Sequence, residues 1–113
     1  MKTHKIILNH EGVIVSSTGT ILHPGAIIQQ SAIQLFPFID SIFEALQQLK
    51  SSDEPLEFSA VNISESPLLP EGYYDYIFTY KDGIEWTIID QTEWYRQKRL
   101  GQQAQYDQLF LDN

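Results

Sequence analysis

Side chains for imidazole or thiol chemistry are few in this chain. It contains three histidines, His4, His10 and His23, and no cysteine. Without thiols there is no disulfide framework, no thiolate metal site, no cysteine nucleophile and no cysteine-linked cofactor. None of the histidines has a second histidine or a carboxylate at the spacing of metal ligands. We therefore predict no metal site and no cofactor. The remaining alternative is a small ligand that binds noncovalently.

Acidic side chains dominate the charge. Fifteen Asp and Glu against seven Lys and Arg give a net charge of −8, which disfavours nucleic acid and an anionic membrane as partners. The acids between Asp53 and Asp75 are interrupted by no Lys or Arg. They form either a solvated rim or a cation-binding loop, and a calcium-loop spacing is missing.

No known catalytic pattern is present. The chain has no Gly-rich phosphate loop, no Gly-x-Ser-x-Gly and no His-Glu-x-x-His. Asp75 and Glu85 are expected on one exposed strand face but separated along the strands, so a catalytic carboxylate pair is not indicated. We predict that this domain is not an enzyme.

The length of 113 residues, with 42% hydrophobic residues, suits one globular domain. No apolar run approaches the ~20 residues of a transmembrane helix, and no signal-peptide core follows the first residues. The expected location is the cytoplasm. Met1 predicts that the natural chain begins here.

The order of elements predicts an α+β fold. Residues 6–8 and 13–15 are expected to form strands around the tight turn 9–12. One or two short helices are expected within 26–35, and a helix over 41–50, where Ser41 and Glu44 have the spacing of a capping box. A half-buried strand is expected over 56–63, with Leu56, Phe58 and Ala60 pointing inward.

A hairpin is predicted around Lys81-Asp82-Gly83. A three-residue loop with Gly83 in the left-handed conformation sets Tyr80 opposite Ile84. Only this register gathers the large side chains on one face, namely Tyr74, Tyr76, Phe78, Tyr80, Ile84, Trp86 and Ile88. The other face then carries Ile77 and Ile89 as a small apolar patch.

Residues 1–92 are expected to form the body, and 93–113 a helix that leaves it. Asp90 is a candidate cap for this helix, with Glu93 three residues later. Leu100 and Leu111 belong to an imperfect heptad-like stripe. Together with Ile77 and Ile89, these leucines predict a homodimer.

The aromatic residues allow two interpretations. Six of them are expected to face one another across the core: Phe36, Phe43, Phe58, Tyr76, Phe78 and Trp86. They either fill the core or line a ligand pocket. The scarcity of polar inward groups favours a filled core. The tyrosine hydroxyls, which need hydrogen-bond partners, are in turn consistent with a ligand pocket.

The order and length of these elements resemble the PAS domain, a sensory module of signalling proteins. Residues 8–14 resemble its opening hairpin, helix 41–50 the helix before its third strand, and residues 81–83 its last turn. Asp90-Gln91-Thr92 resembles the Asp-Ile-Thr signature that ends the last strand, with Gln91 in place of the usual apolar residue. The family commonly has an acidic residue at the position of Asn9 and an asparagine near Ser17.

The resemblance implies a five-stranded antiparallel sheet with short helices on one face and a projecting C-terminal helix. It implies a sensor and dimerisation module, N-terminal in a sensor histidine kinase or another two-component or cyclic-dinucleotide signalling protein. Asp90 and Thr92 would then couple the last strand to the helix and to a downstream domain of the same chain. The helix running to Asn113 predicts that the natural chain continues.

Two alternatives stay open. A small cone-shaped α+β enzyme or binding protein of the ketosteroid-isomerase type suits the length and the curved sheet, but it normally opens with long helices. A free-standing scaffold domain without a ligand is the other.

Overall fold

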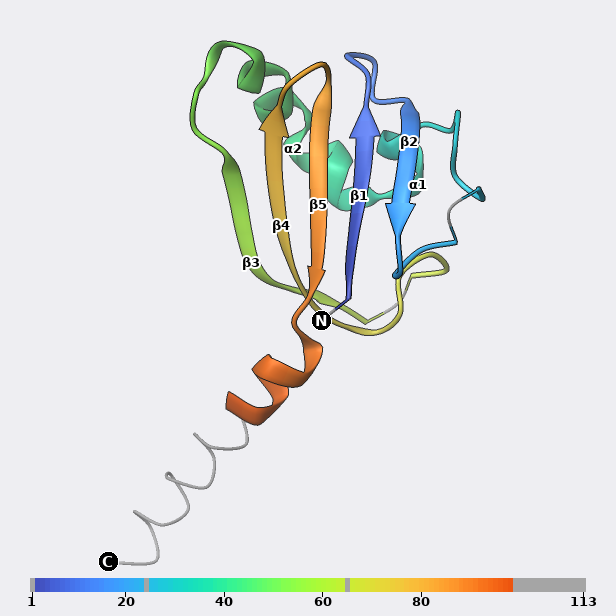
Figure 1. Cartoon of the computed structure of the whole chain (residues 1–113), viewed down its shortest axis with the longest axis vertical. Helices are drawn as coiled ribbons and strands as arrows, with labels where there is room; N and C mark the ends of the chain where they lie inside the picture. Colours follow the sequence, from blue (N-terminus) through green and yellow to red (C-terminus); the bar gives the residue numbers. More distant parts are fainter. Residues whose placement is uncertain (1, 24, 65, 99–113) are drawn as a thin grey trace, which may run out of the picture.

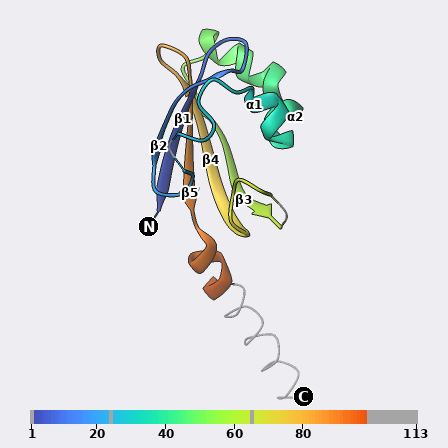
Figure 2. The same ribbon diagram turned by 90° about the vertical axis from the view of Figure 1, so that its right-hand side faces the viewer.

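The computed structural model describes residues 2–23, 25–64 and 66–98. The architecture is α+β: five antiparallel strands form one open sheet in the order β2-β1-β5-β4-β3, and helices cover one face (Figures 1 and 2). The elements are β1 (Thr3–Leu8), β2 (Ile14–Gly19), α1 (Ala32–Leu35), α2 (Pro37–Gln47), the 3₁₀ helix η1 (Gln48–Ser51), β3 (Leu56–Ile63), β4 (Gly72–Tyr80) and β5 (Ile84–Asp90). The predicted fold class and strand number are confirmed.

Residues 92–98, called the exit helix below, are helical and leave the sheet at the end of β5 (Figure 1). Within the described chain, this helix points away from α1 and α2. It starts one residue earlier than expected, at 92.

The first turn depends on Asn9 and Gly12. The Asn9 side-chain oxygen accepts hydrogen bonds from the backbone N–H groups of Glu11 (2.9 Å) and Val13 (3.0 Å). Gly12 has a φ of 83°, and a Cβ there would lie 3.0 Å from both Ile33 and Phe43. Glycine therefore serves two needs at this position, the left-handed backbone and the close approach of the helical layer.

The last hairpin has the predicted register. Tyr80 pairs with Ile84 and Phe78 with Trp86, so the large side chains alternate onto the helical side of the sheet. The predicted left-handed conformation of Gly83 is wrong, because its φ is not positive. Glycine is needed there for space, since a Cβ would lie 2.8 Å from the carbonyl oxygen of Leu8. Tyr80, expected to be buried, is 39% exposed at the end of β4.

The predicted start of the main helix is wrong. Helix α2 begins at Pro37, in the first helical turn where a missing N–H costs no hydrogen bond, and Ser41 lies inside it. The Ser41 hydroxyl donates to the carbonyl of Phe38 instead of capping the helix. The buried side chains of α2 and η1 are Ile39, Leu46 and Leu49.

Strand β3 contains a bulge that the sequence pattern did not reveal. Its register against β4 shifts between Phe58 and Val61, and Ala60 has a φ of 57°. Leu56 and Phe58 point inward before the bulge and Val61 after it, whereas Ala60, predicted to point inward, is exposed.

We expect Gly12→Ala to lower the free energy of unfolding by about 2 kcal/mol, because alanine is strained at positive φ and would crowd Ile33. Gly25→Ala is the matched control, since nothing lies within 4 Å of a Cβ at that position. Its effect should stay within about 0.5 kcal/mol. Urea unfolding measures both, and equal effects of the two substitutions would contradict this account of the turn.

Candidate functional site

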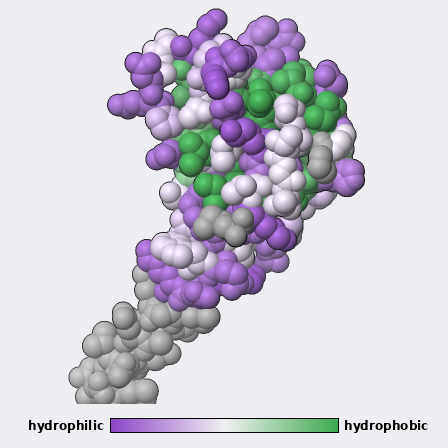
Figure 3. Space-filling view, in the orientation of Figure 1, coloured by the Kyte–Doolittle hydropathy of each residue, from purple (hydrophilic) through white to green (hydrophobic). Residues whose placement is uncertain are grey.

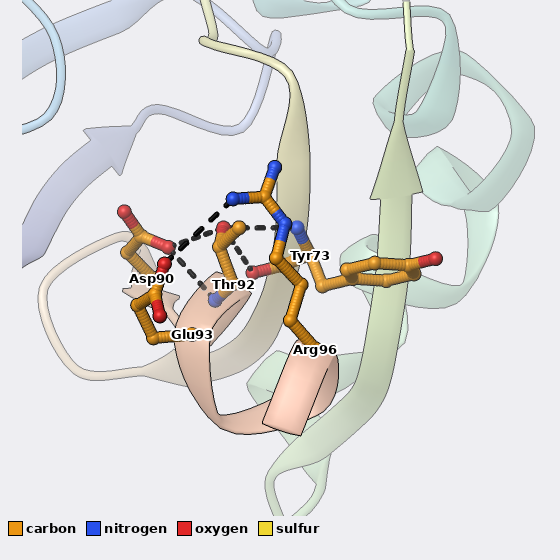
Figure 4. A network of polar contacts seen from close by, with 5 residues as sticks. All are labelled: Tyr73, Asp90, Thr92, Glu93 and Arg96. Carbon is orange, nitrogen blue, oxygen red and sulfur yellow. Dashed lines mark hydrogen bonds and ion pairs between the residues drawn. The ribbon is translucent and has the colours of Figure 1, made fainter. Parts of the chain in front are cut away.

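A group of hydrogen bonds joins the last strand to the exit helix (Figure 4). The Asp90 carboxylate accepts from the Thr92 hydroxyl (2.6 Å) and from the Thr92 backbone N–H (3.0 Å). The same hydroxyl accepts from the backbone N–H of Tyr73 (3.1 Å), at the start of β4. The backbone N–H of Gln91 donates to the Tyr73 carbonyl (2.9 Å). These contacts, called the junction below, connect β4, β5 and the helix start in one network.

The junction is packed as well as bonded. A Cβ on Gly72 would overlap the Thr92 hydroxyl, so the close contact requires glycine. Asp90 was predicted to cap this helix, and its carboxylate does accept the N–H of Thr92, the first helical residue. The N-cap position itself is Gln91, whose carbonyl accepts the first helical bond, from Tyr95. Glu93 lies 3.7 Å from Arg96 in an exposed ion pair and does not complete a capping box with Asp90. Such a pair contributes little to stability.

Asp75 extends this network to β3. One of its carboxylate oxygens accepts from the backbone N–H of Ala60 and from the hydroxyl of Tyr95, both at 3.0 Å. The other accepts from the Gln91 side-chain amide at 3.2 Å. One carboxylate therefore holds the bulge of β3 and the first turn of the exit helix together.

The sequence predicts Asp75 only as an exposed acid. Its partners lie 15, 16 and 20 residues away, and one of them is a backbone N–H freed by the bulge. The pKa of the Tyr95 hydroxyl is raised by desolvation and by its hydrogen bond to this carboxylate.

The outer face of the sheet, which no described helix covers, holds two of the four predicted dimer residues. Ile77 lies across from Thr87 and Ile89 across from Asp75, so the two isoleucines are diagonal neighbours on β4 and β5. Both are half-buried. Figure 3 views this face and shows apolar side chains among polar ones. Leu100 and Leu111 lie outside the described residues.

Five of the six predicted core or pocket residues come together around Trp86. Its ring stacks on Phe78 (5.7 Å between ring centroids) and meets the edges of Phe36 (5.0 Å) and Tyr76 (5.1 Å). Phe58 joins through Phe78. Phe43 instead lies against the first turn at Gly12.

Phe38 takes part in this cluster although the sequence did not single it out. Its ring contacts Phe58 (5.0 Å) and Tyr76 (5.2 Å). The reason is the incorrect helix start at residue 41, which leaves Phe38 outside the predicted helix.

A cavity of about 570 Å³ opens beside the aromatic cluster. It lies between the segment where α1 meets α2, the end of β3 and residues 66–69. Phe36, Tyr76 and Trp86 form its buried end, while Gln34, Asn62 and Pro67 are exposed at its mouth. The aromatic rings thus fill the centre of the core and also line a cavity on one side.

The indole N–H of Trp86 is buried without a hydrogen-bond acceptor among the described residues. An unmet buried donor costs about 1–3 kcal/mol. It is the only such side-chain atom found in the described part of the chain, so it is an exception within an otherwise satisfied core.

His4 is a buried polar residue that sequence analysis did not assign to the core. Its side chain is almost fully enclosed, with Nε2 2.7 Å from the Ser17 hydroxyl. Its Nδ1 accepts from the backbone N–H groups of Ile21 (3.4 Å) and Leu22 (3.3 Å), which a neutral ring protonated on Nε2 can do. Burial lowers the pKa of His4. His10, by contrast, is exposed in the first turn, as expected.

Across residues 2–23, 25–64 and 66–98, no group of three or more potential metal ligands is found. None of the described helices is long and apolar enough to cross a membrane. No protein-family model and no curated protein matches the chain. The candidate site is therefore defined by its geometry: the junction, the Asp75 contacts and the cavity beside Trp86.

The stability of the fold should depend on pH through His4. An unfolded histidine takes up a proton near its ordinary pKa of 6.5, whereas the buried ring resists protonation to a lower pH. Between the lowered pKa and pH 6.5, the unfolded state therefore binds more protons than the folded state. The contribution of His4 to the free energy of unfolding is complete above pH 6.5 and is lost as the pH falls through the lowered pKa of the folded state.

Urea unfolding at several pH values between about 8 and 5 measures this dependence. We expect His4→Gln to remove this component of the pH slope and His10→Gln to retain it, because His10 is exposed. A slope that is the same in wild type and His4→Gln would exclude His4 as its source.

Proposed function

We propose that the chain is a PAS-type sensor and dimerisation module of a signalling protein. It would form the N-terminal part of a sensor histidine kinase, or of another two-component or cyclic-dinucleotide signalling protein, with no enzymatic activity of its own. The observation that supports this best is the junction, in which Thr92 bonds to both Asp90 and Tyr73. It makes the direction of the exit helix depend on where β4 and β5 lie.

Strands β4 and β5 connect the aromatic core to the exit helix. Tyr76 and Trp86 pack beside the cavity on β4 and β5, and the same two strands lead to Tyr73 and Asp90 at the junction. A rearrangement of the rings shifts these strands relative to each other, and the junction transmits the shift to the helix. Asp75 adds the β3 bulge to the same linkage. A downstream domain on the same chain would receive the change.

The order of elements also supports this proposal over the ketosteroid-isomerase-like alternative. That alternative has long helices packed against the sheet, whereas the described helices are short and lie between β2 and β3 or after β5. The main helix, α2, follows β1 and β2 and spans 11 residues.

The coupling can be tested by fusing the chain, in frame, to the catalytic core of a histidine kinase. We expect Thr92→Val and Asp75→Asn each to change the autophosphorylation rate about fivefold or more, because each removes hydrogen bonds that orient the exit helix. Phosphate incorporation measures the rate, with circular dichroism confirming that each variant is folded.

Two controls match these substitutions. Thr18→Val makes the same chemical change at an exposed position of the edge strand β2, and Glu44→Gln neutralises an exposed acid on α2. Both should leave the rate within twofold of wild type. Unchanged rates in Thr92→Val and Asp75→Asn would overturn the proposed coupling.

We further propose a homodimer that uses the outer face of the sheet together with the leucine stripe of the tail. Ile77 and Ile89 give this face a small apolar centre, and polar residues such as Thr87 and Asp75 stand beside them. An antiparallel sheet with one face covered by helices and apolar groups on the other suits face-to-face pairing.

Ile77→Glu with Ile89→Glu, and separately Leu100→Glu with Leu111→Glu, should shift the dimer toward monomer. Buried carboxylates without partners would oppose association at either surface. Thr18→Glu, exposed on the edge strand β2, is the control and should not change the mass. Light scattering measures the mass, and a dimer that survives both double substitutions would refute this mode of association.

A further inference from the structure

A row of four paired residues crosses the outer face of the sheet, the face that no described helix covers. Thr87 on β5 lies between Lys5 on β1 and Ile77 on β4. Ile77 in turn pairs with Glu57 on β3. The row therefore has a cation at one end and an anion at the other, and both of these side chains are exposed.

The two charges of this row are too far apart to meet within one chain. Three strand spacings separate Lys5 from Glu57, which amounts to about 14 Å. Neither side chain forms an ion pair among the described residues. Each of them is therefore available to a charged group on another molecule.

A second copy of the chain is the partner that this pattern fits. When two identical sheets pack face to face, the twofold axis that relates them lies in the plane between them. If that axis runs along the strands, between β4 and β5, Lys5 faces Glu57 of the partner subunit, and Glu57 faces Lys5 of the partner subunit. An axis that runs across the strands along the row sets like charges against each other instead.

The same axis position suits the rest of the face. Ile77 and Ile89 lie on either side of it, so the apolar patch forms the centre of the contact and the charges its rim, as is usual in interfaces. Sheets that pack face to face are ~10 Å apart, a gap that a lysine and a glutamate side chain can bridge together. The other two acids on this face of the strands have partners within the chain. Asp75 makes the contacts described above, and Glu85 accepts from the hydroxyl of Thr79 at 3.4 Å.

We propose that the chain forms a parallel homodimer whose orientation is fixed by two ion pairs, each between Lys5 of one protomer and Glu57 of the other. The proposal rests on the homodimer proposed above and adds its orientation. With an axis along the strands, both exit helices leave the dimer at the same end, where β5 ends (Figure 1). The proposed pairing of the leucine stripes requires this arrangement.

Exchanging the charges tests this orientation. Lys5→Glu and Glu57→Lys each convert both attractive pairs into like-charge pairs, so each variant should dimerise about tenfold more weakly than wild type. The double variant restores opposite charges and should dimerise within about twofold of wild type. Sedimentation equilibrium measures the dissociation constants. The controls are Lys50→Glu on η1 and Glu44→Lys on α2, which make the same charge changes at exposed helical positions and should have no effect.

A mixture of the two single variants gives a second readout. In a dimer of one Lys5→Glu chain and one Glu57→Lys chain, both contacts again join opposite charges. Such mixed dimers should therefore make up about nine-tenths of all dimers, whereas random association would give about half. Native mass spectrometry distinguishes them when one of the variants is labelled with ¹⁵N.

The outcomes separate the orientation from the dimer itself. A wild-type dimer that neither single substitution weakens would overturn the parallel orientation and leave the dimer proposed above in place. A double variant as weak as the single variants would also overturn the orientation, because the two charges would then not face each other. A monomeric wild type would overturn both proposals.

Discussion

The pairing of Tyr80 with Ile84 is the constraint on which the rest of the structure depends. Because side chains alternate along a strand, this one pairing decides the face of every residue on β4 and β5. It sends Tyr76, Phe78 and Trp86 to the helical side, where they form the core. A shift of one residue in the turn would expose the rings and bury Asp75, which would cost both the packing and the solvation of a charge.

The same register also arranges the polar side of the sheet. With Trp86 inward, Asp75 and Ile89 pair on the outer face, close to the end of β5. Asp75 can then reach both the bulge of β3 and Tyr95 of the exit helix. The core and the junction are therefore two consequences of one alternation of side chains along β4 and β5.

Much of the fold follows from local patterns, and the failures have physical reasons. The strands and the register of the last hairpin were predictable because a buried face selects one pairing among few. The start of α2 was not, because Ser41 and Glu44 imitate a cap while Pro37 supplies a better first residue. Gly83 was correctly placed in the turn for an incorrect reason, since the requirement is space beside Leu8.

The candidate site was less predictable than the fold. Asp90 and Thr92 stand close together in sequence and could be recognised, whereas the role of Asp75 depends on a bulge with no clear pattern in Leu56–Ile63. Similarly, His4 is buried through contacts with Ser17 and with backbone groups of Ile21 and Leu22. Such contacts arise only after distant segments have packed, so composition and periodicity carry no trace of them.

The position of β1 has a consequence for biosynthesis. This strand, translated before the other four, lies in the interior of the sheet and needs β5 on its free side. A nascent chain can close the first hairpin early, but one edge of β1 waits unpaired until residues 84–89 have left the ribosome. The sheet is therefore completed only when translation of this domain ends. Until then, the unpaired edge of β1 is exposed to chaperones and to mispairing with other strands.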